Sequence, residues 1–149
     1  SHHIFTETEI FSRYEILLEN YVKTIHIEAK TLYSMVEQQF MPALLHYTDT
    51  LSSSIADKKA VADLPCTAET ALLKDMSAAY ESLYTLSEKL AADTAEAEGL
   101  TDNTKASFFY HDTIIKDMDD IRAVADKAEV KLPKEFLPYP SYEEMLFYV

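Results

Sequence analysis

Residues 6–40 read TETEIFSRYEILLENYVKTIHIEAKTLYSMVEQQF, and this stretch decides the fold. Its start fits a capping box, in which Thr6 accepts a hydrogen bond from the Glu9 amide while the Glu9 carboxylate bonds back to the Thr6 amide. Apolar and aromatic side chains then recur at intervals of three and four, the spacing of one face of an α-helix. The stretch therefore predicts a long helix that begins at Thr6.

The same apolar spacing continues beyond this stretch and predicts a first helix over about residues 6–62. Pro42 lies inside it, where it removes a backbone hydrogen bond and clashes with the preceding turn, so we expect the helix to be kinked or broken near Pro42. We expect the stripe to be core rather than a ligand site. Its members are Ile10, Tyr14, Leu17, Leu18, Tyr21, Ile25, Ala29, Leu32, Met35, Val36, Phe40, Leu44, Tyr47, Leu51 and Ile55.

Two further long helices are predicted, over about residues 67–98 and 101–131. Thr67 is the expected N-cap of the first, and Gly99 is expected to end it in a left-handed C-cap conformation. The short connection around Gly99 makes the two helices antiparallel neighbours. The sequence therefore predicts an all-α protein, an antiparallel bundle of long helices.

The chain is the size of one ordinary domain. Residues 6–149 are expected to form a single helical domain, and residues 1–5 to be a cloning remnant or a linker. After Pro133 the helical sequence pattern ends, because residues that precede prolines avoid the helical region of backbone conformation. Residues 132–149 are therefore predicted to be a short tail rich in aromatic residues and proline.

The composition disfavours or excludes several classes of function. The formal net charge of −13 disfavours binding to nucleic acid or to membrane surfaces, since both carry negative charge. No apolar run is long enough to cross a bilayer. The single glycine, Gly99, excludes the glycine-rich loops that cradle nucleotide phosphates. Cys66 is the only cysteine, which fits a cytoplasmic location.

No catalytic, cofactor-binding or metal-binding residue is predicted. A di-iron bundle needs Glu three residues before a ligating His, but Lys, Ala and Phe stand before His26, His46 and His111. We expect these histidines to be solvated or capping. The serines at 52–54 lack the strained turn that exposes a nucleophile, so a helix surface explains them better.

Two segments are candidates for docking. Arg13 and Tyr14 lie near the start of the first helix, where a planar guanidinium suits a partner surface. The tail carries more aromatic residues than a solvated segment needs, so it should pack on its own bundle or on a partner protein. The tail candidates are Phe136, Pro138, Tyr139, Tyr142, Leu146, Phe147 and Tyr148.

Four pieces of the sequence, in order, resemble the region that follows the catalytic core of type III glutamine synthetases. They are residues 9–29, 41–43, 121–126 and 137–149. Leu137 departs from the family pattern, which has Trp before the Pro-aromatic-Pro sequence, and this weakens the analogy of the tail's docking contact. The resemblance implies the non-catalytic C-terminal helical domain of an ATP-dependent glutamate–ammonia ligase.

On this resemblance, the chain serves in docking or in oligomer assembly. ATP and a divalent metal such as Mg²⁺ are expected only in the catalytic core outside this chain, and the partners are that core or neighbouring subunits of a homo-oligomer. The alternative is a free-standing helical bundle that binds another protein. An enzymatic site built from scattered carboxylates and histidines ranks last.

Overall fold

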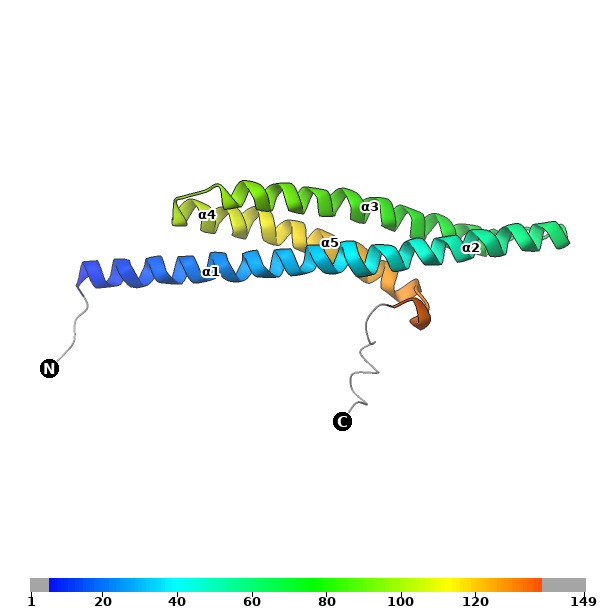
Figure 1. Cartoon of the computed structure of the whole chain (residues 1–149), viewed down its shortest axis with the longest axis horizontal. Coiled ribbons are helices and arrows are strands. Elements are labelled where there is room, and N and C mark those ends of the chain that lie inside the picture. The colour runs from blue at the N-terminus through cyan, green and yellow to red at the C-terminus, as the bar shows by residue number, and fades with distance from the viewer. Residues whose placement is uncertain (1–5, 138–149) are drawn as a thin grey trace, which may run out of the picture.

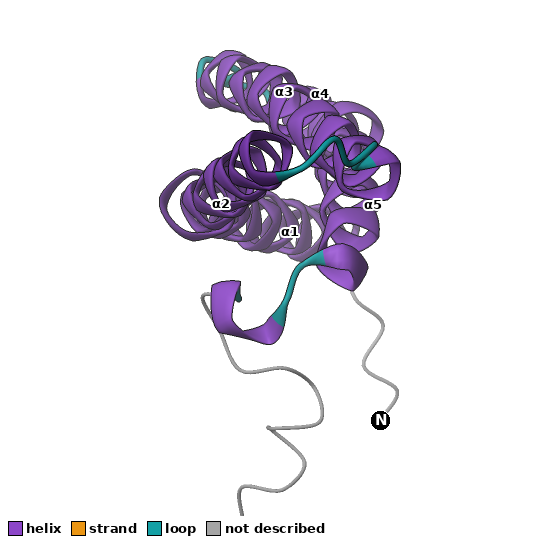
Figure 2. Ribbon diagram, turned by 90° about the vertical axis from the view of Figure 1, so that its right-hand side faces the viewer, coloured by secondary structure: helices purple, strands orange, loops and turns teal. Residues whose placement is uncertain are grey.

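The computed structural model describes residues 6–137, and every regular element within that range is a helix. Figure 1 shows long helical rods running side by side, and Figure 2 shows them grouped around a common centre. The first rod consists of α1 (Glu7–Met35), the π turn η1 (Val36–Phe40) and α2 (Met41–Val61). The others are α3 (Thr67–Glu98), then α4 (Asn103–Phe109), η2 (Tyr110–Ile114) and α5 (Ile115–Lys131), followed by a 3₁₀ turn, η3 (Lys134–Phe136).

The predicted all-α antiparallel bundle is confirmed, and the observed helices closely follow the predicted ranges. The capping box at the start of α1 is also present. The Glu9 amide donates to the Thr6 hydroxyl at 3.2 Å, and the Thr6 amide donates to the Glu9 carboxylate at 3.0 Å. Two amides at the first turn, which no helical carbonyl reaches, are thereby satisfied.

The interruption predicted at Pro42 takes the form of the π turn η1, and the rod continues through it (Figure 1). The Met41 amide donates to the carbonyl of Val36, five residues back. This wider turn lies directly before Pro42, where the proline has no amide to donate and its ring would clash with the carbonyl four residues earlier. Pro42 itself occupies the first turn of α2, where a missing amide costs little.

The expected N-cap at Thr67 is wrong. Thr67 is already the first helical residue, and the N-cap is Cys66 in the left-handed conformation, with φ 47° and ψ 37°. The Cys66 side chain makes no capping bond, but its carbonyl accepts from the Thr70 amide at 3.0 Å. The sharp reversal between α2 and α3 selects this backbone conformation, which propensity for a capping side chain does not reveal.

The left-handed cap expected at Gly99 is also wrong, because Gly99 has φ −77° and ψ −11°. The end of α3 is closed instead by tight turns, in which Gly99 donates to Glu96 and Leu100 donates to Ala97, both at 3.1 Å. Asp102 then caps α4 by accepting from two backbone amides. Tightening of the last helical turn satisfies the final carbonyls without a positive φ.

The core lies between the rods. α3 packs against both α2 and α5, and α1 packs mainly against α4, with further contacts to α3 and η2. Leu44, Leu83, Ile114 and Ile121 are completely buried there. Within the described range no helix is both long and apolar enough to cross a lipid bilayer.

Candidate functional site

The first rod is longer than its neighbours at the N-terminal end. Asn103, at the tip of the α3–α4 hairpin, donates from its amide to Glu15 at 3.0 Å and to Glu19 at 3.2 Å. The tip therefore lies level with this part of α1, and the turns before it project past the hairpin (Figure 1). We call residues 7–14 the overhang.

Apolar side chains cover the overhang and the turn that follows it. Their exposed fractions are 56% for Ile10, 63% for Phe11, 51% for Tyr14 and 66% for Leu17, and Phe108 of α4 is 63% exposed nearby. These five residues are called the N-terminal apolar surface. The expectation that the first part of the stripe is core is wrong at Ile10, Tyr14 and Leu17, because the hairpin, whose tip bonds to Glu15 and Glu19, is too short to cover them.

A hollow of about 550 Å³ opens at the inner edge of this surface, between α1 and α4. Leu17, Leu18 and Tyr21 line it from α1, and Phe108 and His111 line it from the third rod. Its walls are mainly apolar side chains. Such a hollow beside exposed apolar residues suits the anchoring side chain of a docked protein.

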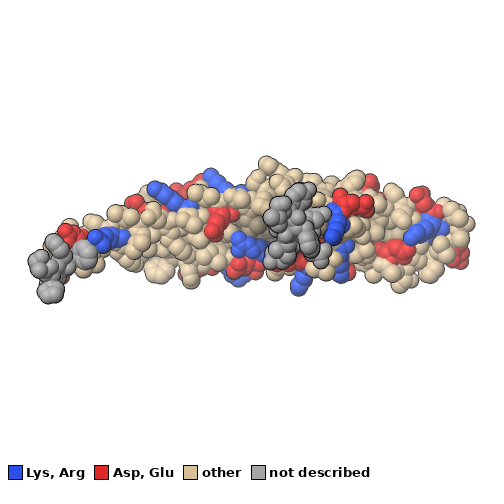
Figure 3. All heavy atoms as spheres, turned by 90° about the horizontal axis from the view of Figure 1, so that it is seen from below, with Lys and Arg blue, Asp and Glu red and all other residues tan. Residues whose placement is uncertain are grey.

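Carboxylates frame the N-terminal apolar surface. Residues 7–19 and 102–112, which meet at the hairpin tip, contain six carboxylates, and their only Lys or Arg side chains are Arg13 and Lys105. Seen from below, the end of the molecule formed by α1 is mostly uncharged, apart from one acidic and one basic patch at its tip (Figure 3). The carboxylates are Glu7, Glu9, Glu15, Glu19, Asp102 and Asp112.

The predicted docking residues are not all brought together. Arg13 and Tyr14 are exposed on the overhang and its surface. Phe136 lies about 48 Å away along the first rod, where its ring packs on His46 and Tyr47 with centroid distances of 5.1 and 5.0 Å. The base of the tail thus packs on its own bundle. The remaining candidates lie outside the described residues: Pro138, Tyr139, Tyr142, Leu146, Phe147 and Tyr148.

His26 joins three helical segments, which the sequence did not reveal. Its Nδ1 lies 2.9 Å from the Tyr110 hydroxyl, and its Nε2 lies 3.3 Å from the Glu98 carboxylate. Burial, and then the charge of Glu98, raise the pKa of Tyr110. The expectation of a solvated or capping histidine is therefore wrong for His26. Its place one residue after the buried stripe position Ile25 was the available signal.

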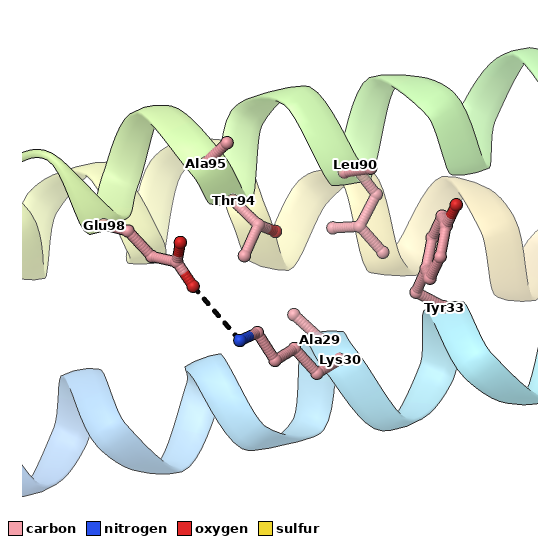
Figure 4. A pocket seen from close by; sticks show the side chains of 8 residues that line it. Ala29, Lys30, Tyr33, Leu90, Thr94, Ala95 and Glu98 are labelled. Atoms are coloured by element: carbon pink, nitrogen blue, oxygen red, sulfur yellow. Dashed lines mark ion pairs between the residues drawn. The ribbon is translucent and has the colours of Figure 1, made fainter.

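A groove runs between α1 and α3 beside this histidine (Figure 4). It has a volume of about 400 Å³. The two helices form its sides, and small side chains such as Ala29 leave room for it between them. Tyr33 lies toward one end, and an ion pair of 3.2 Å between Lys30 and Glu98 lies at the other. Two of the side chains that bound the groove, Lys30 and Glu98, are thus already paired with each other.

A buried carboxylate lies between α3 and α5. The side chain of Asp117 is only 4% exposed, and Lys89 lies 2.5 Å from its Oδ1 and 2.6 Å from Asp93. Its Oδ2 has no hydrogen-bond partner within the described part of the chain. Burial, followed by the neighbouring Asp93 carboxyl, raises the pKa of Asp117. Across residues 6–137 no three His, Cys, Asp or Glu side chains cluster in a way that could hold a metal ion.

Comparison with known proteins identifies the domain. Residues 1–59 match the family model described as the glutamine synthetase C-terminal domain. The chain is 43% identical over 147 residues to a glutamine synthetase from Butyrivibrio fibrisolvens, an alignment that covers 98% of this chain and 21% of that protein. Along nearly its whole length the chain is thus similar to a glutamine synthetase, and its first 59 residues resemble the C-terminal domain of such enzymes.

Two more distant relatives agree with this assignment. The domain is 24% identical over 149 residues to a glutamine synthetase from Bacteroides fragilis (strain YCH46) and 26% identical over 151 residues to a type-3 glutamine synthetase from Dictyostelium discoideum. Each alignment covers 97% of this chain and 20% of the relative. The domain therefore spans about a fifth of the length of the relatives that it matches.

The family match falls on the first rod. Residues 1–59 include all of α1 and η1 and nearly all of α2. The overhang and the four α1 residues of the N-terminal apolar surface thus lie in the part of the chain that the family model matches.

Proposed function

We propose that this C-terminal domain docks on the rest of a type III glutamine synthetase and helps to assemble its homo-oligomer. The joining of glutamate and ammonia at the expense of ATP is assigned to the part of the polypeptide outside this chain, called the catalytic region below. ATP and Mg²⁺ would bind there. No residue of this domain is proposed to act in catalysis, and the enzyme is proposed to be cytoplasmic.

The observation that carries the proposal is the N-terminal apolar surface. Four neighbouring α1 side chains each expose half or more of their surface, although they continue a stripe that is buried elsewhere on the same helix. Covering apolar surface stabilises a complex by roughly 25 cal/mol per Å² before the costs of association. A contiguous apolar patch on a soluble domain is typical of a protein interface.

The first rod is suited to hold this surface away from the bundle. It runs from Glu7 to Val61 through continuous α- and π-helical turns, which corresponds to a length of about 80 Å. Its second half is fixed by contacts with α3, and Phe136 packs on it near the base of the tail. The rod therefore acts as a rigid strut whose projecting end docks.

The test is to mix this domain with the catalytic region, prepared without the equivalent C-terminal segment, and to measure co-migration in size-exclusion chromatography. Association is expected, and Leu17→Glu is expected to weaken it about 30-fold or more, because a charge would be buried in an apolar interface. Ile27→Glu is the matched control, since Ile27 is 64% exposed on α1 but lies outside the surface.

Absence of association at high micromolar concentration, under conditions where both parts are folded, would contradict the proposal. It would favour a free-standing interaction module. Metal bound by the purified domain, or turnover of glutamate and ATP by the domain alone, would instead favour an active site within this chain.

A further inference from the structure

We infer that the N-terminal apolar surface receives an α-helix of the catalytic region, with an apolar ridge flanked by Lys and Arg, rather than a second copy of this domain. The inference rests on the proposed function and names the partner of the same surface. Three features carry it: the shape of the stripe, the hollow beside Leu17, and the surrounding charge.

The shape of the exposed stripe fits a helix. Ile10, Tyr14 and Leu17 are separated by four and three residues, and Tyr21 and Ile25 continue the same stripe. Those two continuing residues are covered within the bundle, where α1 packs on the helices α4 and η2. A partner helix placed beyond the tip of the α3–α4 hairpin would thus extend the packing that the bundle already uses.

The hollow supplies the anchor. Leu17 and Phe108 stand on its two sides, each exposed by more than six-tenths, and Leu18 and Tyr21 lie deeper along α1. A volume of about 550 Å³ accommodates a large apolar side chain of the partner. Interface energy is usually concentrated in a few such anchors, so Phe108 and Leu17 are expected to be the largest contributors.

Charge selects between the possible partners. Six carboxylates, and Arg13 and Lys105 as the only Lys or Arg side chains, flank the surface in residues 7–19 and 102–112. Two copies pairing through this surface would bring both acidic frames together, and like charges at an interface oppose association. A helix flanked by Lys and Arg would instead complement the frame. The relatives are about five times longer than this chain, which leaves ample polypeptide to supply such a helix.

Two measurements test the inference. Sedimentation equilibrium of the domain alone should show a monomer at high micromolar concentration. In a fluorescence-anisotropy titration with the catalytic region, Phe108→Ala should weaken binding about tenfold. The double variant Glu7→Lys with Asp112→Lys should weaken it about tenfold at 50 mM salt and clearly less at about 500 mM, because salt screens exposed charges.

Glu7 and Asp112 are chosen because both are exposed and neither is the cap of a helix. The matched control reverses two exposed charges elsewhere, Asp57→Lys with Asp126→Lys, and should leave binding within about twofold. The same change in net charge is then placed away from the surface.

The outcomes separate the inference from the proposed function. A dimer of the domain that Leu17→Glu dissociates would overturn the inference, although a role in assembly would stand. Binding that is unchanged by Glu7→Lys with Asp112→Lys would overturn the inference that the partner helix is basic. Neither self-association nor binding to the catalytic region would overturn both.

Discussion

Leu17 and Leu44 belong to the same apolar stripe of the same continuous rod, yet Leu17 is 66% exposed and Leu44 is completely buried. The difference lies outside the rod. α3 covers the stripe around Leu44, whereas the α3–α4 hairpin ends before it reaches Ile10 and Tyr14. Periodicity therefore shows which face of a helix must be covered, but it does not show what covers it.

The largest expected effect comes from truncating the two leucines. Leu44→Ala should lower the free energy of unfolding by about 2–5 kcal/mol, because it removes buried methyl groups and leaves a cavity. Leu17→Ala should change it by no more than about 0.5 kcal/mol, since the side chain is largely in water already. Urea denaturation of the 149-residue chain measures both. A large cost for Leu17→Ala would mean that the isolated domain already covers its N-terminal apolar surface.

This comparison also marks how far the sequence could lead. The helix ranges followed from periodicity, and the start of α1 followed from Thr6 and Glu9, because these are local signals. The exposure of Ile10, Tyr14 and Leu17 could not be predicted, since it depends on where a distant hairpin ends. Predicted core residues at the end of a helix are thus candidates for an interface.

The other differences between the sequence predictions and the structure have the same origin. The contacts of His26 with Tyr110 and Glu98 join residues that are far apart in the chain, and no local pattern encodes such contacts. The backbone conformations of Cys66 and Gly99 are set by how the adjoining helices pack. Arg13 and Tyr14 were singled out from their place in the helix, and they lie on the projecting end that now carries the docking proposal.

His26 lies within the covered part of α1, and its removal should give the second largest effect. His26→Ala leaves the buried hydroxyl of Tyr110 without its partner, which costs about 1–3 kcal/mol. Tyr110→Phe removes the hydroxyl itself and should cost less, about 0.5–1.5 kcal/mol, because the partly exposed histidine can then bind water. Equal costs in urea denaturation would show that packing of the tyrosine ring, not the hydrogen bond, stabilises the contact between α1 and η2.

Asp117 is a polar residue buried within the bundle. Its substitution should have a smaller, pH-dependent effect on the free energy of unfolding. Because burial raises its pKa, folding takes up a proton between the unfolded value of about 3.9 and the raised folded value. Stability from this group is therefore lost as the pH rises through that window. Asp117→Asn keeps the shape without the charge, so its stability relative to wild type should improve on going from pH 4.5 to pH 7.5, as buffered urea denaturation would show.

Asp126→Asn serves as the control for this pH dependence, because Asp126 is an exposed carboxylate on α5, the same helix as Asp117. It should follow wild type at both pH values. If Asp117→Asn and Asp126→Asn show the same profile, the burial of Asp117 does not govern its ionisation.

The smallest effect on global stability is expected in the capping box, at the start of α1. With no helix beside it, the overhang depends on local signals, so Thr6→Ala should weaken its first turns by about 1 kcal/mol while global unfolding changes little. Hydrogen exchange of the amides at 7–14 should become about fivefold faster, and exchange around Leu44 should not change. Thr8→Ala is the matched control, because Thr8 lies in the same turn but does not form the cap. If the catalytic region is then added, protection of the overhang should return in both variants, since a docked helix would supply the packing that the isolated domain lacks. Protection that stays low on binding would mean that the docking contact lies elsewhere on the domain.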